Sequence, residues 1–427
     1  MAGVLPLLQE SCRIGAEKTQ CPDTMNDSLL SGLPGNTDTT MTDARSNNTF
    51  LVYNTSFFDV SQTFIYHQVK ALQNMGQVHL LGSQFMNPHG FPMECYTRHE
   101  VRKIRGLIGR VTGKFWKRSF FDRQSSSYLH KLFRETGFSM VHAHFGTNAL
   151  DILPYARRYG VPMVVSFHGA DASRMVRMPH YTRRLPALFN YASAIIISGR
   201  HMAGTLNLHP WSDKVHHVVY GVQVPEQGSY GKADGTGTVK ILHSGRLVPK
   251  KGVPDLIRVF GELQSEVGCV ELHIAGGGEE LPRCRELVDM LNLQTQVIFH
   301  GPVSNSRVQE LLEQADVFVL NSRTAPDGDM EGTPVTLLEA MAMGKAVVST
   351  RHAGIPDVIS HEQNGLLADE YSNTQLKENI KRLLTDSELR HALGKKAGCQ
   401  IKKLYSVETM TYTLGQIFSG IVTSAGK

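Results

Sequence analysis

The sequence lacks several features that would mark particular protein classes. None of its six cysteines has C-x-x-C spacing, which argues against a zinc ribbon or a redox dithiol. Its longest apolar runs are a handful of residues, whereas a membrane span needs about 20. The apolar stretch Val4–Leu8 has no basic region before it, so we expect no signal peptide and a cytoplasmic protein. The net charge of +5 is too small for a dedicated nucleic-acid binder.

The positive charge is concentrated in one stretch. Residues 98–123 contain nine basic and two acidic residues, a net charge of +7, so the rest of the chain sums to −2. Apolar and aromatic residues interleave with these cations. The stretch is either a solvated basic helix with its apolar side in the core or an interfacial segment that docks on anionic lipid. The second interpretation places these residues in a membrane patch: Arg102, Lys103, Arg105, Lys114, Trp116, Lys117 and Arg118.

The order of apolar and polar segments predicts two domains of α/β class. Residues 1–49 are polar and lack periodicity, which predicts a disordered arm. Strand and helix patterns alternate over 50–222 and again over 239–404, which predicts two doubly wound, Rossmann-like parallel sheets. The Gly- and Pro-rich stretch 223–238 predicts a linker, and 405–427 a helix that returns to the first domain. Such domains bind ligands beyond the carboxyl ends of their strands, so we expect a site in a cleft between them.

A helix is predicted at 334–343, in the region of the sequence where candidate site residues are most concentrated. Thr333 is the expected N-cap, Pro334 the first helical residue and Gly344 the stop. The first amides of a helix have no carbonyl partners within it, and with the helix dipole they form an anion site suited to a diphosphate. The amides predicted to do so are those of Val335, Thr336 and Leu337.

Two glutamates flank and enter this helix. Glu331 lies just before it and Glu339 inside it, so both are interpreted as functional residues, beside a helix that otherwise packs its apolar face. Eight helical steps would part them by about 12 Å. Glycosidase carboxylates lie about 5–9.5 Å apart, so the spacing argues against a glycosidase pair.

Two loops after predicted strands could meet a phosphate ligand. In SGRLVPKKG, Arg246 and Lys251 are two cations that could neutralise a diphosphate, although a solvated loop is an equal alternative. Lys250 is interpreted as solvated. The AGGGE segment at 275–279 lacks the third glycine of a dinucleotide fingerprint, so it predicts a tight turn beside the ligand, not an NAD site.

Histidine and aspartate residues near strand ends raise the question of a metal. His168 and Asp171 directly follow a strand, in a place suited to a site residue. His142 and His144 alternate along another strand, but no third ligand accompanies them, so packing or cleft lining is favoured over zinc. The acidic pair in Asp327–Asp329 has the spacing of a metal-binding motif, but we predict no metal site.

Taken together, these motifs resemble the retaining glycosyltransferases of family 4, which have the GT-B fold. The resemblance covers about residues 50–404 and is strongest for the subgroup that builds bacterial exopolysaccharides, including colanic-acid-type enzymes. It is carried by HAHFG at 142–146, FHGAD at 167–171, SGRLVPKKG at 244–252, DVFVLNS at 316–322, GDMEGTPVTLLEAMAMGKAVVST at 328–350 and HAGIPDVI at 352–359.

The resemblance implies a nucleotide-diphosphate sugar donor, a UDP- or GDP-sugar, and an acceptor that is a glycan or a polyprenyl-linked glycan. It implies no metal and no cofactor. The implied catalytic residues are Glu331, His168 and Asp171. The implied donor-binding residues are Gly245, Arg246, Lys251, Val303, Gly332, Val335, Thr336 and Glu339. The acceptor-side residues are Ser61, Gln62 and Thr63, with Gln62 where relatives often have glutamate.

Two other functions are compatible with the same fold. One is a nucleotide-sugar epimerase, which would need no acceptor. The other is a non-catalytic scaffold with a degenerate site. Arg246, Lys251, Glu331 and Glu339 are all present, which argues against a degenerate site.

Overall fold

The structure is a computed structural model, and it describes residues 48–57, 62–87, 91–93, 96–111, 114–225 and 237–425. Between residues 104 and 120 only the backbone is described. Most of the predicted arm (1–49), most of the predicted linker (223–238) and the acceptor-side residue Ser61 lie outside the described residues.

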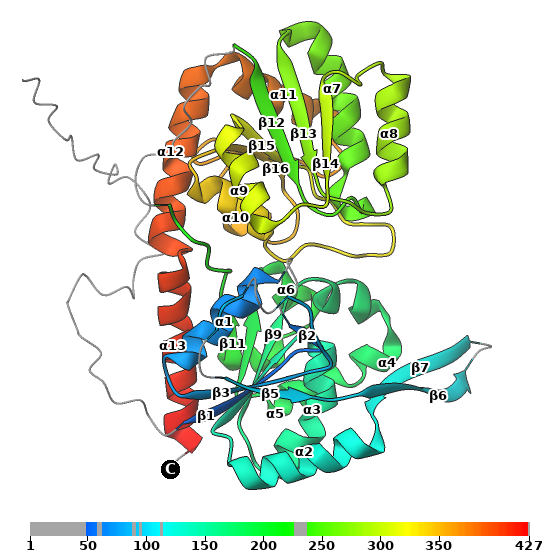
Figure 1. Cartoon of the computed structure of the whole chain (residues 1–427), viewed down its shortest axis with the longest axis vertical. Coiled ribbons are helices and arrows are strands. Elements are labelled where there is room, and N and C mark those ends of the chain that lie inside the picture. Colours follow the sequence, from blue (N-terminus) through cyan, green and yellow to red (C-terminus); the bar gives the residue numbers. More distant parts are fainter. Residues whose placement is uncertain are drawn as a thin grey trace, which may run out of the picture. The chain divides into compact units, whose positions relative to one another are not determined.

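Two parallel sheets organise the chain, one in each half of the sequence (Figure 1). The first has seven strands in the order β11 (Val215–His217), β10 (Ala194–Ile197), β9 (Met163–Phe167), β8 (Met140–His144), β1 (Thr49–Tyr53), β3 (Gln77–Gly82) and β5 (Tyr96–Glu100). The second has six strands in the order β14 (Val297–Gly301), β13 (Val270–Ala275), β12 (Val239–Ser244), β15 (Val317–Leu320), β16 (Ala346–Thr350) and β17 (Leu366–Ala368). This is the predicted fold class, two Rossmann-like parallel sheets.

Helices alternate with these strands along the chain. Those of the first half are α1 (Thr63–Gln73), α2 (Arg123–Thr136), α3 (Gly146–Arg158), α4 (Pro179–Thr182), α5 (Leu185–Tyr191) and α6 (His201–Thr205). Those of the second half are α7 (Val253–Val267), α8 (Leu281–Met290), α9 (Asn305–Gln314), α10 (Val335–Ala342), α11 (Asn373–Thr385), α12 (Ser387–Leu404) and α13 (Val407–Ala425). Short 3-10 helices are η3 (Ala170–Ala172), η4 (Arg174–Arg177), η5 (His209–Lys214), η6 (Pro249–Lys251) and η7 (Ile355–Asp357).

Both faces of each sheet are buried, as the apolar runs of the strands require. Phe318 of β15 packs in the cluster that contains α9 and α10, whereas Val319, its neighbour, packs in the cluster that contains α7, α8 and α11. Successive residues of a strand point to opposite faces, so helices on both sides are needed to cover them. The continuous apolar runs of the sequence are therefore fully buried parallel strands.

The strand order reverses direction once in each sheet. In the second sheet, β13 and β14 lie on one side of β12 and β15–β17 lie on the other. In the first sheet, β1 has β3 on one side and β8 on the other. Ligands of doubly wound sheets bind at such reversal points, beyond the carboxyl ends of the strands. The segments after β12 and β15, and after β1 and β8, are therefore the places to look for a site.

The C-terminal helix α13 packs on the first half of the chain. It contacts α1, and its buried side chains include Met410, Leu414 and Phe418. The Phe418 ring lies 5.3 Å from the ring of His142 on β8. The chain therefore returns to the first sheet after completing the second one.

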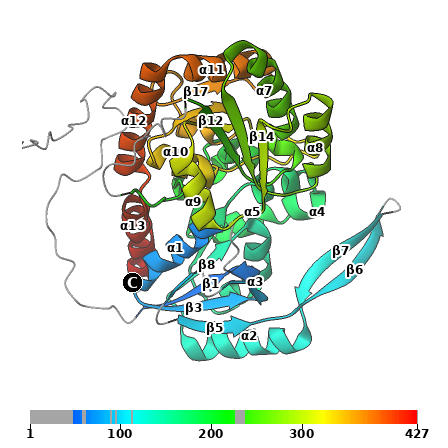
Figure 2. The same cartoon turned by 45° about the horizontal axis from the view of Figure 1, so that its top comes forward.

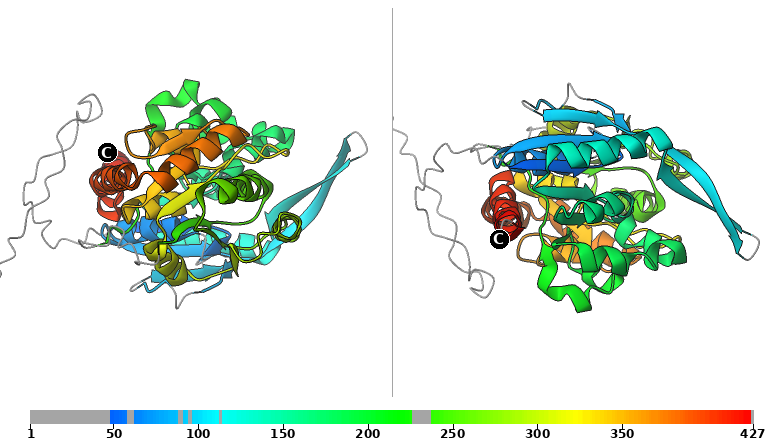
Figure 3. Two further views of the ribbon diagram at one scale, coloured as in Figure 1. Left: turned by 90° about the horizontal axis from the view of Figure 1, so that it is seen from above. Right: turned by 90° about the horizontal axis from the view of Figure 1, so that it is seen from below.

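Most of the basic stretch forms a β-hairpin, so one of its two alternative interpretations, a solvated basic helix, was wrong. β6 (Lys103–Val111) pairs antiparallel with β7 (Lys114–Phe121). The hairpin projects from the first domain (Figure 2). Viewed from above and below, it lies on the opposite side of that domain from α13 (Figure 3). β-branched and aromatic residues in this stretch favour an extended strand, which the helical interpretation overlooked.

Candidate active site

The loop after β12 brings a lysine and a glycine turn together at the reversal point of the second sheet. A Cβ atom added to Gly245 would lie 3.3 Å from Cε of Lys251, so the lysine stem packs on the Gly245 backbone. A Cβ atom on Gly276, whose φ is +142°, would lie 1.9 Å from the Gly245 carbonyl oxygen. Only glycine permits so close an approach. The AGGG segment is thus a tight turn that supports the Lys251 loop.

Lys251 forms a buried ion pair with Glu331. Its Nζ lies 2.9 Å from Oε1 of Glu331, and both side chains are about 10% exposed. The hydroxyl of Ser322, just after β15, donates to the same oxygen at 3.4 Å. Burial opposes ionisation of Glu331, but Lys251 and Lys250 outweigh it and lower the pKa of the carboxyl to about 2. Burial also lowers the pKa of Lys251, against the raising effect of Glu331. Glu331 is therefore ionised at neutral pH.

Lys250 is not solvated, contrary to the prediction. Its side chain is 8% exposed, and its Nζ lies 3.2 Å from Oδ2 of Asp329 and 3.9 Å from Oε2 of Glu331. It also donates to the Met330 carbonyl at 3.2 Å. Adjacent lysines in the η6 turn both reach the Glu331 loop, which the sequence pattern could not reveal. Asp329 is therefore paired with a cation.

Thr333 does not cap α10, contrary to the prediction. The helix begins at Val335 with Pro334 as its N-cap, and the Thr333 hydroxyl donates to the Ser198 carbonyl at 2.5 Å. The Leu337 amide donates to the Pro334 carbonyl at 3.2 Å, so of the three predicted amides, those of Val335 and Thr336 are left at the helix start. Gly344 has a φ of +67° and ends the helix as predicted.

Glu339 lies in the second turn of α10 and is partly buried. Burial raises the pKa of its carboxyl to about 7. On the same helix, the Thr336 hydroxyl donates to the Ser244 carbonyl at the end of β12, at 3.2 Å. The start of α10 is thereby tied to the reversal point. The two glutamates have opposite electrostatic environments. A lysine pairs with Glu331, whereas among the described residues no ion pair compensates the burial of Glu339.

His168 follows β9 and is held by aromatic and imidazole groups. Its Nδ1 lies 3.0 Å from the Tyr220 hydroxyl, and its Nε2 lies 3.2 Å from Nδ1 of His144. The Phe64 ring packs on it with ring centroids 4.7 Å apart. Burial lowers the pKa of His168 to about 3, so its imidazole is neutral at physiological pH. His142 and His144 are fully buried side chains of β8, in accord with packing.

Asp171 binds backbone amides in the turn after β9. Its Oδ1 accepts from the amides of His168 at 3.0 Å and Gly169 at 3.1 Å, and its Oδ2 accepts from Gly146 at 2.9 Å. Both carboxylate oxygens are thus occupied within the protein. This geometry fixes the His168 turn.

Backbone contacts bring the His168 turn next to the Glu331 loop. A Cβ atom on Gly332 would lie 2.5 Å from the His168 carbonyl oxygen, and one on Gly169 would lie 3.4 Å from the Met330 carbonyl oxygen. The Met330 amide donates to the Ser173 hydroxyl at 3.1 Å. The structure therefore joins Lys251, Glu331, Gly332 and His168 into one site built from both halves of the sequence.

The remaining predicted residues lie around this centre or away from it. Gln62 precedes α1, and its Oε1 accepts from the Asn54 side chain after β1 at 3.0 Å; Thr63 begins α1. Arg246 is exposed on the loop after β12. Val303 follows β14, which is two strands from β12, so it lies farther along the sheet edge than Lys251.

Lys103 does not belong to a free basic patch, contrary to the prediction. Its Nζ lies 2.9 Å from Oδ2 of Asp151, and its side chain is 14% exposed. Arg102 is exposed. The side chains of Arg105, Lys114, Trp116, Lys117 and Arg118 lie outside the described part of the chain.

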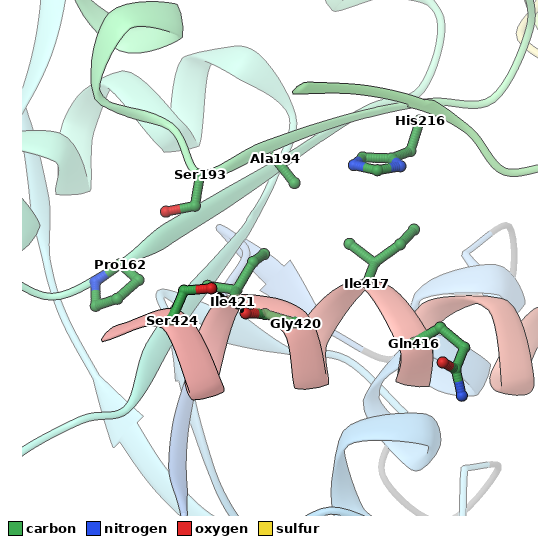
Figure 4. Close-up of a pocket in the computed structure, with 9 residues that line it drawn as sticks. All are labelled: Pro162, Ser193, Ala194, His216, Gln416, Ile417, Gly420, Ile421 and Ser424. Carbon is green, nitrogen blue, oxygen red and sulfur yellow. Dashed lines mark hydrogen bonds between the residues drawn. The ribbon is translucent and has the colours of Figure 1, made fainter. Parts of the chain in front are cut away.

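A pocket lies apart from this site, at the amino ends of β9, β10 and β11 (Figure 4). Pro162, Ser193 and His216 line it from the sheet, and Ile417 and Ile421 line it from α13. None of the predicted site residues that the structure describes lines it. The chemistry is therefore expected at the carboxyl edges of the sheets and not in this pocket.

In the ranges that the structure describes, no three His, Cys, Asp or Glu side chains are grouped as a metal site would require. The acidic residues of the Asp327–Asp329 motif instead pair with cations, Asp327 with Arg174 at 3.1 Å and Asp329 with Lys250. Over the same ranges, no helix is both long and apolar enough to cross a bilayer.

Comparison with known proteins assigns the two halves to two family models. The model described as Glycosyltransferase Family 4 matches residues 61–224, and the one described as Glycosyl transferases group 1 matches residues 232–398. WcaL of Escherichia coli, which has a provisional assignment as a colanic acid biosynthesis glycosyltransferase, is 31% identical over 359 residues, covering 75% of this chain and 86% of WcaL. The chain belongs to glycosyltransferase family 4. The amylovoran biosynthesis glycosyltransferase AmsK of Erwinia amylovora is 33% identical over 222 residues, 52% of this chain and about half (54%) of AmsK.

Solved structures show that this glycosyltransferase has the GT-B fold. HepE of Anabaena, solved in complex with UDP, superposes with a TM-score of 0.70 at 15% identity, over 87% of this chain and 100% of that one. Sucrose-phosphate synthase of Thermosynechococcus elongatus gives 0.69 at 15% identity, over 88% and 100%. At these identities the likeness concerns the fold alone.

Several residues of the glycosyltransferase site had not been predicted. They are Lys250, Ser322, Tyr220, Phe64 and His352, and all of them contact a predicted residue. Ser322 and His352 stand inside the quoted motifs, so their positions after β15 and β16 were a usable signal. Tyr220 and Phe64 reach His168 from distant segments, which no local pattern indicates.

Proposed function

We propose that the protein is a retaining glycosyltransferase that moves a sugar from a nucleotide-diphosphate sugar to a glycan or lipid-linked glycan. The Glu331–Lys251 ion pair carries the proposal, because it joins a carboxylate and a cation at the reversal point of the second sheet, beside His168. Family membership and the reversal-point position support a nucleotide-sugar site there. HepE has been solved with UDP-glucose, which supports a UDP-sugar as the first donor to test.

We expect cationic side chains and backbone amides to bind the nucleotide-sugar donor. Arg246 and Lys251, with the amides of Val335 and Thr336, would bind the diphosphate. Gly245 and Gly332 would let the backbone approach the donor closely. Glu339 would accept a hydrogen bond from a ribose hydroxyl, and Val303 would contact the base. No metal or cofactor enters the proposal.

The proposed chemistry takes place between Glu331 and His168. The bond from the sugar C1 to the diphosphate oxygen breaks, and its electron pair stays on the phosphate. The acceptor hydroxyl attacks C1 from the same face and passes its proton to the leaving phosphate. Lysine and arginine beside the diphosphate stabilise the charge that develops as the bond breaks. Glu331 would orient the sugar and His168 would line the reacting centre, while Asp171 would position His168.

The proposed pathway is the synthesis of an extracellular or capsular polysaccharide. WcaL and AmsK, whose descriptions name colanic acid and amylovoran biosynthesis, support this assignment. The acceptor would then be a growing, polyprenyl-linked glycan. Gln62 and Thr63, at the start of α1, would face it.

We propose that the β6–β7 hairpin contacts an anionic membrane surface, at the inner face of the cell membrane. Two wholly apolar pairs, Ile104–Phe120 and Ile108–Trp116, lie four residues apart and therefore on the same face of the ribbon. Register positions between them carry Arg105, Lys117 and Arg118. Each cation near an anionic surface contributes about 1 kcal/mol.

Vesicle flotation tests this contact. We expect the protein to float with phosphatidylglycerol-containing vesicles and not with neutral phosphatidylcholine vesicles. The double substitution Lys117→Glu and Arg118→Glu should abolish flotation, whereas Lys131→Glu on α2 should not. Equal flotation with both vesicle types, or with the double variant, would refute the contact.

A donor-hydrolysis screen tests the proposed function. Purified protein is incubated with UDP-, GDP- and ADP-sugars, and release of the nucleotide and of the sugar is measured. We expect turnover of at least one donor, its loss in Glu331→Gln, and weaker donor binding in Arg246→Ala. Glu286→Gln, an exposed change on α8, is the matched control. Turnover of no donor would overturn the proposal, and an epimerised nucleotide sugar as the product would favour the epimerase.

A further inference from the structure

A buried histidine in the loop after β16 contacts the backbone of Glu331. The side chain of His352 is 0% exposed. Its Nε2 lies 3.1 Å from the Glu331 amide nitrogen, and its Nδ1 lies 2.6 Å from Oε1 of Glu370. The imidazole therefore bridges the proposed sugar-orienting residue and a carboxylate two residues beyond β17.

These two contacts determine which nitrogen of His352 carries the proton. A backbone N–H can only donate, so Nε2 must accept from Glu331 and has no proton in this contact. Nδ1 then carries the proton and donates to Glu370. A histidine bound on both sides in this way has a fixed tautomer and a fixed ring orientation.

Glu370 also holds the other end of the Glu331 loop. Its Oε2 accepts from the Thr324 amide at 2.8 Å. Burial opposes ionisation of Glu370, but the bonds from His352 and Thr324 outweigh it and lower the pKa of its carboxyl. The loop between β15 and α10 is thus tied to Glu370 at Thr324 directly and at Glu331 through His352.

The same segment makes one more backbone contact with the loop. The Gly354 amide donates to the Gly332 carbonyl at 3.2 Å, and a Cβ atom on Gly354 would lie 2.5 Å from that oxygen. Residues 352–354 therefore pack directly against residues 331–332. Loss of the His352 contact would therefore directly affect the position of the Glu331 backbone.

We infer that His352 is a positioning residue for Glu331: together with Glu370 it fixes the backbone from which the Glu331 carboxylate reaches Lys251. This inference rests on the proposed function only for its catalytic consequence. The anchoring itself is a property of the loop and is tested separately.

Two substitutions of similar size separate the two contacts of His352. A Gln side chain reaches the position of Nε2 and can accept from the Glu331 amide, whereas an Asn side chain ends at the position of Nδ1. We expect His352→Asn to lower kcat of donor hydrolysis about 100-fold, because a displacement of about 1 Å has that cost. His352→Gln should retain most of the activity. Binding of UDP alone should change little in either variant, since the two ring nitrogens of His352 contact the Glu331 amide and the Glu370 carboxylate.

Hydrogen exchange of the peptide that contains Glu331 tests the anchoring without any activity. We expect faster exchange at this amide in His352→Asn than in His352→Gln or the wild type. His391→Asn, an exposed change on α12, is the control, and thermal unfolding confirms that each variant folds. Equal exchange in all variants would overturn the inference. If the wild type turns over no donor but the exchange differs as expected, the anchoring stands and the proposed function fails.

Discussion

The two glutamates that the sequence singled out differ in ionisation because of their neighbours. Glu331 faces Lys251 and has a pKa of about 2, whereas burial alone raises the pKa of Glu339 to about 7. Identical side chains eight residues apart therefore carry different charges near neutral pH. This difference suits the proposed roles, since a carboxyl that interacts with a ribose hydroxyl and one that orients a sugar need not share a charge state.

Glu339 should make stability depend on pH. Its pKa in the folded protein is above the ordinary value of 4.5, so the folded state binds more protons, and its contribution to stability is fully present below pH 4.5 and is lost as pH rises through about 7. In the wild type, we expect this group to lower the free energy of unfolding by up to about 3 kcal/mol between pH 5 and pH 8. In Glu339→Gln this pH-dependent fall should be absent. Urea unfolding at several pH values, with Glu286→Gln as control, measures it. An unchanged pH dependence in Glu339→Gln would contradict the assigned pKa.

Removing Lys251 should destabilise the protein more than removing an exposed cation. Lys251→Met leaves Glu331 buried without its nearest partner, and breaking a buried pair from one side costs about 3–5 kcal/mol. Lys131→Met on α2 should cost almost nothing. The double variant Lys251→Met, Glu331→Gln should regain part of the loss, since no unpaired charge remains. Denaturant unfolding gives all three values, and additive losses in the double variant would rule out the pairing.

At the scale of elements, glycine turns hold the loop that carries Lys251 in place. The AGGG turn after β13 packs on the loop after β12, with the closest approach at Gly276. The SGRLVPKKG loop therefore takes its shape partly from a neighbouring strand, 31 residues away along the chain between Gly245 and Gly276.

Gly276→Ala should disrupt donor binding. Its Cβ atom would lie 1.9 Å from the Gly245 carbonyl oxygen, and its φ of +142° is unfavourable for alanine. We expect a loss of more than about 1 kcal/mol in stability, with weaker binding of the donor found in the screen. Gly415→Ala is the matched control, because α13 has open space there and alanine is favoured in a helix by up to about 1 kcal/mol. Titration and scanning calorimetry measure donor affinity and unfolding temperature. Equal values for Gly276→Ala and Gly415→Ala would disprove the steric argument.

At the scale of the whole molecule, both halves of the chain contribute to one site. The Thr333 hydroxyl donates to the Ser198 carbonyl, the Met330 amide to the Ser173 hydroxyl, and Arg174 pairs with Asp327. After α12, the chain returns to the first sheet through α13. The first domain is therefore completed by the last helix of the sequence.

Phe418→Ala should show how much α13 contributes to this completion. Phe418 is fully buried against β8, and truncating a buried phenylalanine costs about 3–5 kcal/mol. Tyr412→Ala, on the same helix but 49% exposed, should change stability by less than about 0.5 kcal/mol. Thermal and denaturant unfolding compare the two variants. Similar losses for both would mean that α13 is not anchored through its buried face.

The sequence by itself determined the fold class and most of the elements of the site. Apolar runs of parallel strands predicted both sheets. The segments at the carboxyl ends of β9 and β12 were found because such ends bear ligands, whereas the Glu331 region was found by the start pattern of α10. Local physics suffices for this, since strand length, helix periodicity and turn glycines act over a few residues. The α10 stop at Gly344 was predicted in the same way.

Only the tertiary structure decided which groups pair. Lys250 and Lys103 were predicted as solvated and patch cations, but Asp329 and Asp151 lie beside them from distant segments. The Thr333 hydroxyl bonds the Ser198 carbonyl instead of capping its own helix, and His352 accepts from the Glu331 amide across a loop. Ion pairs and hydrogen bonds depend on positions within about 3–4 Å. Those positions are set by packing between residues remote in sequence, and no local pattern records them.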